Sequence, residues 1–383
     1  MSDCILCKSN NINIFFKLKK FPLFFGAVDE KFIREVPKFD LNMAICNECY
    51  LFQQTDLVDE NTMNSVYTAE YYNCPSPSSS DIGKREIHKF LNFFNENELK
   101  TGTLLEVACF DGYLLDILQK DNWDIHGCDP ATMTKIAIDK FGTEKIKQEF
   151  LSENSYAEKQ FDVIIFRNLL EHIYDINKFI QLIGKLLKDD GSIFIDLPNA
   201  KTIEQYGGYG LFFHQHISYF SIETMEHFLS LNNFEIINFK DESPNLFIQA
   251  KKSKNIKPKK LLNNFSYEKL LANNIHISKS IKNFFSKNES IIFFGASALA
   301  TTIFCFLDSD EKNKVKAIYD NENVKHNKLL QGTDIKIQNP STLNVAENHV
   351  IFITTFFFAD QIFNQLIKVG IPKKSIIKIK EIL

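Results

Sequence analysis

The stretch from Leu104 to Gly112 constrains the fold of this 383-residue chain more than any other segment. It reads as an apolar strand, a tight turn of small residues, and then a helix that begins at Tyr113. In an open α/β sheet, a nucleotide-like ligand binds at such a strand-to-helix turn, outside the carboxyl ends of the strands. Glu106 lies at the tip of the expected strand, and Gly112 allows a close approach of the backbone.

A second acid strengthens this interpretation. Asp129 ends the next apolar segment, and an acid about 20 residues after the turn is the usual acceptor for ribose hydroxyls. The pattern G-x-G-x-x-G is absent from the chain, so we expect no dinucleotide. The combination resembles the S-adenosylmethionine (SAM) site of class I methyltransferases. The plain alternative is a generic βαβ unit that binds no cofactor.

Three further segments resemble parts of the same methyltransferase fold. Residues 161–166 read as a buried strand, and residues 167–173 are similar to the segment whose backbone passes beside the methionine part of SAM. A helix is expected over residues 179–187, a turn over 188–191 and a strand over 192–198. The resemblance makes Glu171 and His172 structural rather than catalytic.

The segment before the first strand is rich in proline and serine and is expected to be a loop, residues 67–81. Ser80 or Asp81 is expected to cap a helix that buries Phe90 and its apolar neighbours. The tyrosines and serines of this loop either line the cofactor site or form a plain linker. The expected cofactor-binding residues are Glu106, Ala108, Asp111, Gly112, Asp129, Asn168, Tyr72 and Ser78.

A histidine pair follows the fifth expected strand, where a sheet of this kind binds its substrate. His214, His216 and Tyr219 lie within six residues of one another. An imidazole with a pKa near 6.5 suits a general base at neutral pH. The alternatives are a metal site, for which the neighbouring sequence offers no carboxylate, and two histidines that only hydrogen-bond within a loop.

Four cysteines near the start of the chain form two C-x-x-C pairs. Two such turns close a tetrahedral site and leave no open position, so we expect a structural Zn²⁺ rather than a catalytic one. The alternatives are four unrelated reduced cysteines or a redox centre, and no βαβ unit of the thioredoxin kind surrounds these pairs. The expected ligands are Cys4, Cys7, Cys46 and Cys49.

The order of these segments resembles the sugar C-methyltransferases, which methylate C-3 of nucleotide-linked 4-keto-deoxysugars. In that family the histidine segment reads Tyr-His-Glu-His-x-Ser-Tyr-Phe-Ser, and its second histidine, here His216, is taken as the base. This chain has Phe213 for the tyrosine and Gln215 for the glutamate, and it has Ala108 where the first SAM motif carries glycine. These departures leave room for O- or N-methylation, or for a binding module without catalysis.

The C-terminal part contains a second strand-turn-helix pattern over residues 290–302, after a helix over 267–287. The family resemblance implies that this domain helps to hold a nucleotide-linked sugar. The alternative is a domain used only for packing or dimer contacts. The expected substrate-binding residues are Gln215, Gly295, Ser297, Asp320 and Thr333.

The expected architecture is therefore α/β, with a zinc-binding module (1–65), a class I SAM methyltransferase domain (66–250) and a second Rossmann-like domain (251–383). The net charge of −4 gives no electrostatic footprint for nucleic acid. No run of about 20 apolar residues predicts a membrane span. We expect a cytoplasmic protein that is either a monomer or a dimer.

Overall fold

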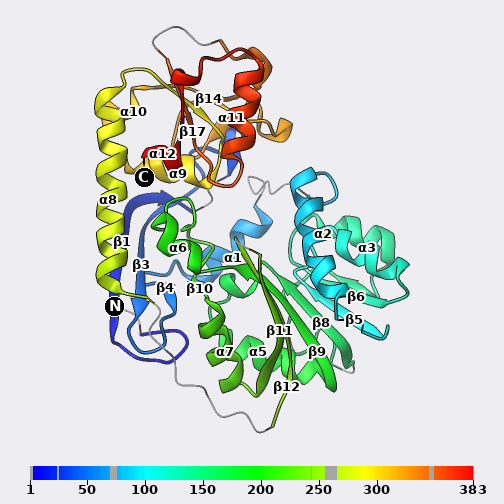
Figure 1. Cartoon of the computed structure of the whole chain (residues 1–383). Coiled ribbons are helices and arrows are strands. Elements are labelled where there is room, and N and C mark those ends of the chain that lie inside the picture. The colour runs from blue at the N-terminus through cyan, green and yellow to red at the C-terminus, as the bar shows by residue number, and fades with distance from the viewer. Residues whose placement is uncertain are drawn as a thin grey trace.

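The computed structural model contains three regions, coloured from blue to red along the chain in Figure 1. None of the helices among the described residues is long and apolar enough to cross a membrane. The structure describes residues 3–23, 26–69, 76–97, 99–157, 159–242, 244–254, 265–344 and 349–382.

The N-terminal region is a four-stranded sheet in the order β1-β3-β4-β10. Its last strand comes from the histidine segment, so this segment is attached to the N-terminal module by backbone pairing with β4. Helix α8 packs along β1 from the C-terminal side of the chain (Figure 1). The elements are β1 (Ile12–Pro22), η1 (Glu30–Phe32), β3 (Lys38–Cys46), β4 (Phe52–Gln54), α1 (Glu60–Thr68), β10 (Ser218–Tyr219) and α8 (Tyr267–Lys287).

The central region is a seven-stranded sheet in the order β11-β12-β9-β8-β5-β6-β7. Strand β5 is parallel to both β6 and β8, whereas β12 is antiparallel to β9. The strands are β5 (Thr103–Val107), β6 (Asp124–Cys128), β7 (Ile146–Lys147), β8 (Phe161–Arg167), β9 (Leu187–Pro198), β11 (Phe234–Glu242) and β12 (Asn245–Lys252).

Helices cover both faces of this sheet because successive side chains of a strand point to opposite faces. Leu104 packs with apolar residues of α2, α3 and α4, whereas Leu105 packs with those of α5 and α7. Ser80 caps α2, as expected, since its hydroxyl accepts the N–H of Gly83. The helices are α2 (Asp81–Asn95), α3 (Tyr113–Lys120), α4 (Thr134–Phe141), η2 (Leu170–His172), α5 (Ile176–Leu186), α6 (Lys201–Tyr206) and α7 (Ile222–Leu231).

The turn expected over residues 188–191 is part of β9. The pairing explains the difference, because Leu187 lies opposite Phe161 and Ser192 lies opposite Val163. The intervening residues therefore bulge from the strand without ending it. Lys188 at this bulge forms an ion pair with Asp162 at 2.9 Å.

The C-terminal region is a five-stranded parallel sheet in the order β16-β14-β13-β17-β18, so the second strand-turn-helix expectation is met. A short antiparallel pair, β2 with β15, ties this region to the N-terminal module. The strands are β2 (Ala27–Val28), β13 (Ile291–Phe294), β14 (Val315–Tyr319), β15 (Leu329–Leu330), β16 (Ile337–Gln338), β17 (Val350–Ile353) and β18 (Ile376–Lys378). The helices are α9 (Ala298–Phe306), α10 (Ser309–Lys312), η3 (Asn323–Lys325), η4 (Pro340–Thr342), α11 (Ala359–Lys368), η5 (Lys373–Ser375) and α12 (Ile379–Ile382).

Candidate active site

The turn after β5 contains three residues with left-handed backbone. The φ angles of Ala108, Phe110 and Gly112 are 63°, 47° and 74°. This conformation costs a residue with a side chain roughly 1–2 kcal/mol, so Ala108 adopts it only because the surroundings hold it there. The alanine at position 108 therefore keeps the backbone in a conformation that glycine adopts readily.

Asp129 is one of the groups that hold this turn. Its two carboxylate oxygens accept the N–H groups of Phe110 at 3.1 Å and of Ala131 at 2.7 Å. The side chain thus connects the turn after β5 to the turn after β6. It lies where the sequence predicts an acceptor for ribose hydroxyls, and that role stays a prediction.

Asp111 connects the same turn to the segment before α2. Its carboxylate accepts the hydroxyl of Ser76, the N–H of Ser78 at 3.0 Å and the N–H of Tyr113 at 3.1 Å. Ser78, an expected cofactor residue, is therefore at the turn. Tyr72, the other expected residue of this segment, lies outside the described residues.

Glu106 is a buried acid with an unpaired carboxylate oxygen. It is 3% exposed, and its Oε2 accepts no hydrogen bond from the described residues. Burial raises the pKa of Glu106 to about 8, against the opposing effect of Arg167, and the charges of Asp111 and Asp129 add to the rise. A cationic ligand would offset this concentration of acids. SAM carries both a sulfonium and an ammonium, so the residues present fit this cofactor.

Asn168 lies at the neighbouring strand end. It follows β8, has φ 47° and is exposed, and its N–H donates to the carbonyl of Asp196 at 2.7 Å. Because β8 is the parallel neighbour of β5, the carboxyl ends of these two strands meet at one edge of the sheet. The position agrees with the expected SAM contact, which stays a prediction.

Gln54 of the N-terminal module fixes the histidine loop. Its side-chain N–H₂ group lies 2.8 Å from the carbonyl oxygens of both His214 and His216, and 3.2 Å from that of Phe213. Gln54 itself is buried. The N–H of Ile217 in turn donates to the backbone carbonyl of Glu171 at 2.7 Å. The loop is therefore held between the N-terminal sheet and the end of β8.

His216 lies beside a carboxylate that is distant in the sequence. Its Nε2 is 3.8 Å from Oε1 of Glu171, in the short helix η2. Glu171 is 1% exposed, and neither of its carboxylate oxygens has a hydrogen-bond partner among the described residues. Phe213 packs on the imidazole of His216 with ring centroids 4.0 Å apart. The expectation of no carboxylate near the histidines is therefore wrong, because folding brings Glu171 to His216 from 45 residues away in the sequence.

His172 and Tyr67 complete the cluster, and the sequence did not single out either as catalytic. The Tyr67 hydroxyl lies 3.0 Å from Nδ1 of His172. The rings of His172 and His216 meet edge to face at 4.7 Å. The side chains of His216 and His172 keep 12% and 18% of their surface exposed, so a ligand can reach both.

Burial sets the protonation of this cluster. Desolvation, together with the neighbouring His172, lowers the pKa of His216 well below its usual value. Desolvation lowers the pKa of His172 to about 4 and raises that of Glu171 to about 8. At neutral pH the two imidazoles are therefore uncharged, and His216 is able to accept a proton.

The cluster lies at the same edge as the SAM turn. Glu171 and His172 lie in η2, which follows β8. Because β8 is the parallel neighbour of β5, η2 and the turn after β5 both lie beyond the carboxyl ends of these strands. The two halves of the expected site, cofactor turn and histidine segment, are thus brought together.

His214 lies apart from the cluster. It is fully buried, its Nε2 lies 3.2 Å from the carbonyl oxygen of Phe21, and its ring contacts the rings of Phe21 and Phe39. The structure therefore places this expected catalytic residue in the contact between the loop and the N-terminal module. The next residue, Gln215, does not share this contact with the N-terminal module, because its side chain hydrogen-bonds to Tyr67.

Tyr219 is buried at the back of the cluster. Its ring centroid is 5.4 Å from that of His216, and its hydroxyl donates to the carbonyl of Leu211. Burial and the charge of Glu171 raise the pKa of Tyr219 well above its usual value. Its phenol therefore stays protonated and braces the loop, and the predicted catalytic role of Tyr219 stays a prediction.

The expected substrate residues of the C-terminal domain are engaged within that domain. Asp320 accepts the N–H of Ala296 at 2.7 Å and forms an ion pair with Lys325 at 3.0 Å. Ser297 caps α9 and donates to the carbonyl of Thr354. The remaining two positions are Gly295, with φ 111°, and Thr333, whose hydroxyl donates to the carbonyl of Leu330.

The four N-terminal cysteines converge. Their Sγ atoms all lie within 4.8 Å of one another, and the Cys4–Cys49 and Cys7–Cys46 distances are 3.4 and 3.6 Å. A tetrahedral site with Zn–S bonds of about 2.3 Å has sulfur atoms about 3.8 Å apart. The donor set therefore fits Zn²⁺, and zinc stays a prediction.

Two protein families match consecutive parts of the chain. Residues 81–238 match the family described as a methyltransferase domain, and residues 240–376 match the family described as a C-methyltransferase C-terminal domain. The chain carries a SAM-dependent methyltransferase domain and a C-methyltransferase C-terminal domain. The class I SAM methyltransferase fold predicted from the sequence is thereby confirmed, whereas the domain boundaries stay predictions.

Individual relatives are more distant. A ubiquinone biosynthesis O-methyltransferase of Pelagibacter ubique (strain HTCC1062) is 32% identical over 117 residues, which is 29% of this chain and 48% of that protein. The C-methyltransferase NovU of Streptomyces niveus is 25% identical over 194 residues, 49% of this chain and 44% of that protein. The chain thus matches about half the length of these curated relatives.

Solved structures of methyltransferases also align with part of this chain. One is a SAM-dependent methyltransferase from Clostridium acetobutylicum ATCC 824, with 16% identity and a TM-score of 0.36. The alignment covers 44% of this chain and 92% of that structure.

Proposed function

We propose that this protein transfers the methyl group of SAM to a carbon next to a keto group in a nucleotide-linked sugar, in bacterial glycan biosynthesis. The observation that carries the proposal is the uncharged, partly exposed His216 beside buried Glu171, at the edge of the sheet that also holds the SAM turn. The C-methyltransferase C-terminal match and the relative named C-methyltransferase NovU support carbon as the acceptor atom.

The protein's own residues perform the proton chemistry in this proposal. SAM, when bound at the turn after β5, supplies a methyl group on a positively charged sulfur. His216 accepts the proton from the acceptor carbon, and Glu171 stabilises the imidazolium that results. We assign the Tyr67–His172 pair to the oxygen of the enolate, because hydrogen-bond donors aimed at developing charge stabilise it most where water is excluded.

His214 and Tyr219 act as positioning residues in this scheme. Each is buried, and each is bonded to a backbone carbonyl away from the exposed edge of His216. Gln54 holds the histidine loop by hydrogen bonds to the backbone carbonyl oxygens of His214 and His216. We therefore expect losses at these three positions to appear as misplacement of His216 rather than as loss of a reacting group.

A second acceptor chemistry has its own support. The match to an O-methyltransferase and the presence of Phe213 and Gln215 in place of tyrosine and glutamate favour transfer to oxygen or nitrogen. Removing a proton from a hydroxyl or an amine requires a weaker base than removing a proton from carbon.

The test is product analysis after incubation with SAM and a panel of dTDP-, GDP-, UDP- and CMP-linked sugars in D₂O. The proposal expects the gain of one methyl group bound to carbon in the product, and deuterium at the carbon beside the ketone in sugar that is incubated with the enzyme without methyl transfer. A methyl group found on oxygen or nitrogen, without such exchange, assigns transfer to that atom. SAM binding without a methyl gain on any sugar contradicts the proposal and favours another acceptor or a binding module.

We also propose that Zn²⁺ is held by the four cysteines and stabilises the N-terminal module. Cys46 ends β3, and the next strand of the same sheet, β4, carries Gln54. A closed four-thiolate site has no position for substrate, so the ion is structural. A cytoplasmic location, where these thiols stay reduced, accompanies this proposal.

A further inference from the structure

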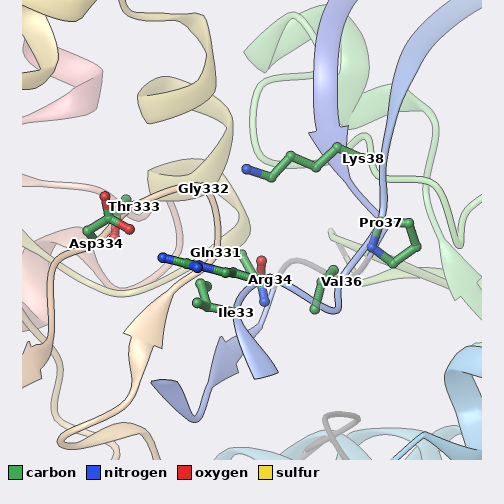
Figure 2. A pocket seen from close by; sticks show the side chains of 9 residues that line it. All are labelled: Ile33, Arg34, Val36, Pro37, Lys38, Gln331, Gly332, Thr333 and Asp334. Carbon is green, nitrogen blue, oxygen red and sulfur yellow. The ribbon is translucent and has the colours of Figure 1, made fainter. Parts of the chain in front are cut away.

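A hollow away from the histidine cluster lies between the N-terminal module and the C-terminal domain. It is a cavity of about 500 Å³. The loop before β3 contributes Arg34, the first residue of β3 is Lys38, and the loop after β15 contributes Gln331, Thr333 and Asp334 (Figure 2). The short β2–β15 pair joins the same two regions. We call this hollow the seam cavity.

Gln331 is the unusual residue of the seam cavity. Its side chain is fully buried, yet neither Oε1 nor Nε2 has a hydrogen-bond partner among the described residues. A buried side-chain amide almost always forms hydrogen bonds within the protein. An amide that is buried without a partner loses its hydrogen bonds to water and gains none in exchange. An unpaired amide in the wall of a cavity therefore indicates a ligand that supplies both a donor and an acceptor.

The charges of the seam cavity define the kind of ligand. Arg34 and Lys38 are exposed, and neither forms an ion pair within the described ranges of the chain. In Figure 2 the side chain of Arg34 extends across the cavity toward Thr333 and Asp334. Arginine binds phosphate through two parallel N–H donors, and lysine adds a point charge. Asp334 on the opposite wall is an acceptor for hydroxyl groups.

We propose that the seam cavity binds a phosphorylated, hydroxyl-bearing ligand, with Arg34 and Lys38 on the phosphate and Gln331 and Asp334 on the hydroxyl-bearing part. Such a ligand spans the N-terminal module and the C-terminal domain. The ligand is either the diphosphate part of the proposed substrate or a separate phosphorylated molecule. The seam cavity has the size of an ordinary small-molecule site.

The seam cavity is also connected to the histidine loop. Phe39, the neighbour of Lys38, contacts the ring of His214 with centroids 6.0 Å apart. His214 lies two residues before His216 in the loop that Gln54 holds. Occupation of the seam cavity therefore stabilises the wall against which the catalytic loop packs.

The first test is calorimetric titration of the full chain with pyrophosphate and with UDP, in the absence of SAM. The double variant Arg34→Gln/Lys38→Gln is expected to bind both probes at least about tenfold more weakly, because it loses two charge-assisted contacts. The control Lys279→Gln/Lys287→Gln removes the same charge from exposed positions of α8 that do not line the cavity, and it is expected to bind like the unaltered chain. No binding of either probe at millimolar concentration, or equal affinity of both double variants, overturns the proposal.

A second variant tests the buried amide. Gln331→Met keeps the approximate shape and removes both unpaired atoms, so it is expected to raise the melting temperature of the free protein and to weaken UDP binding several-fold. A lowered melting temperature together with unchanged UDP affinity contradicts the role of Gln331.

Kinetic measurements with the acceptor sugar show whether the ligand of the seam cavity is part of the substrate or a separate molecule. A raised KM with unchanged kcat in Arg34→Gln/Lys38→Gln assigns the seam cavity to the diphosphate of the substrate. An unchanged KM with weakened UDP binding assigns it to a separate ligand, and both results support the site. Binding is measured without methyl transfer, so failure of the proposed function leaves this test intact.

Discussion

Replacing Glu171 with glutamine tests whether the buried carboxylate supports proton abstraction by His216. The side chain keeps its shape and loses its charge. Oε1 of Glu171 lies 3.8 Å from Nε2 of His216. If His216 is the base, the imidazolium formed during the reaction loses its counter-charge in the variant.

The magnitude follows from this distance. At 3.8 Å and an effective dielectric constant of about 20, the attraction between carboxylate and imidazolium is about 4 kcal/mol. Because the pKa of Glu171 is about 8, ionising it at pH 7 costs about 1.4 kcal/mol. The net stabilisation is about 3 kcal/mol, which corresponds to a fall in kcat of about 100-fold when proton removal limits the rate.

The assay is methyl transfer from labelled SAM under saturating acceptor, as a function of pH. In the unaltered enzyme kcat is expected to rise as the pH passes through about 8, because Glu171 loses its proton there. Glu171→Gln is expected to lack this rise and to keep its affinity for SAM. The control Glu153→Gln removes an exposed carboxylate paired with Lys185 and is expected to change nothing.

The reasoning is refuted if folded Glu171→Gln retains kcat within about threefold of the unaltered enzyme, or if it keeps the rise near pH 8. The first result removes the carboxylate from the proton transfer. The second assigns the rise to a different group.

The remaining predictions concern zinc, pH and SAM. The purified chain is expected to hold one zinc ion, and Cys49→Ser is expected to lose both the ion and several degrees of melting temperature; elemental analysis that finds no zinc in the unaltered chain contradicts this. The free energy of unfolding is expected to fall by about 2 kcal/mol between pH 7 and pH 5 through His214 alone. The pKa of His214 is about 4 in the folded chain and about 6.5 in the unfolded chain, so the unfolded chain gains a proton first as the pH falls. His214→Asn should remove that share of the fall in urea unfolding at the two pH values, and an unchanged pH dependence argues against a buried neutral imidazole. Glu106→Gln is expected to weaken SAM binding about tenfold in calorimetry while leaving stability nearly unchanged, because the buried acid is mostly protonated at pH 7 until a cation binds; unaltered affinity would separate Glu106 from the cofactor.

Local pattern was sufficient to predict the elements that surround the site. The strand at Leu104, the helix from Tyr113 and the capping of α2 by Ser80 depend on periodicity and on short-range hydrogen bonds, which neighbouring residues determine. The fold class of the central domain followed from the family resemblance, whereas its strand order came only from the structure.

The histidine cluster shows where local pattern stops being informative. The resemblance to methyltransferases predicted structural roles for Glu171 and His172. Glu171 lies 45 residues before His216 in the sequence, and Tyr67 lies in a third segment. Their proximity depends on the parallel pairing of β8 with its neighbours and on the attachment of the histidine loop to β4. The separation of His214 from His216 has the same origin, because Phe21 and Phe39 of the N-terminal module bury the former.

The sequence by itself determined the kind of chemistry: a SAM turn, four thiols with metal-ligand spacing, and a histidine segment. Only the tertiary structure decided which imidazole is reachable, which carboxylate stands beside it and which buried amide is left unpaired at the seam. The physical reason is that residue type and spacing set what a group can do, whereas burial and distant charges set its pKa and its partners, and these arise only when strands far apart in the chain are packed together.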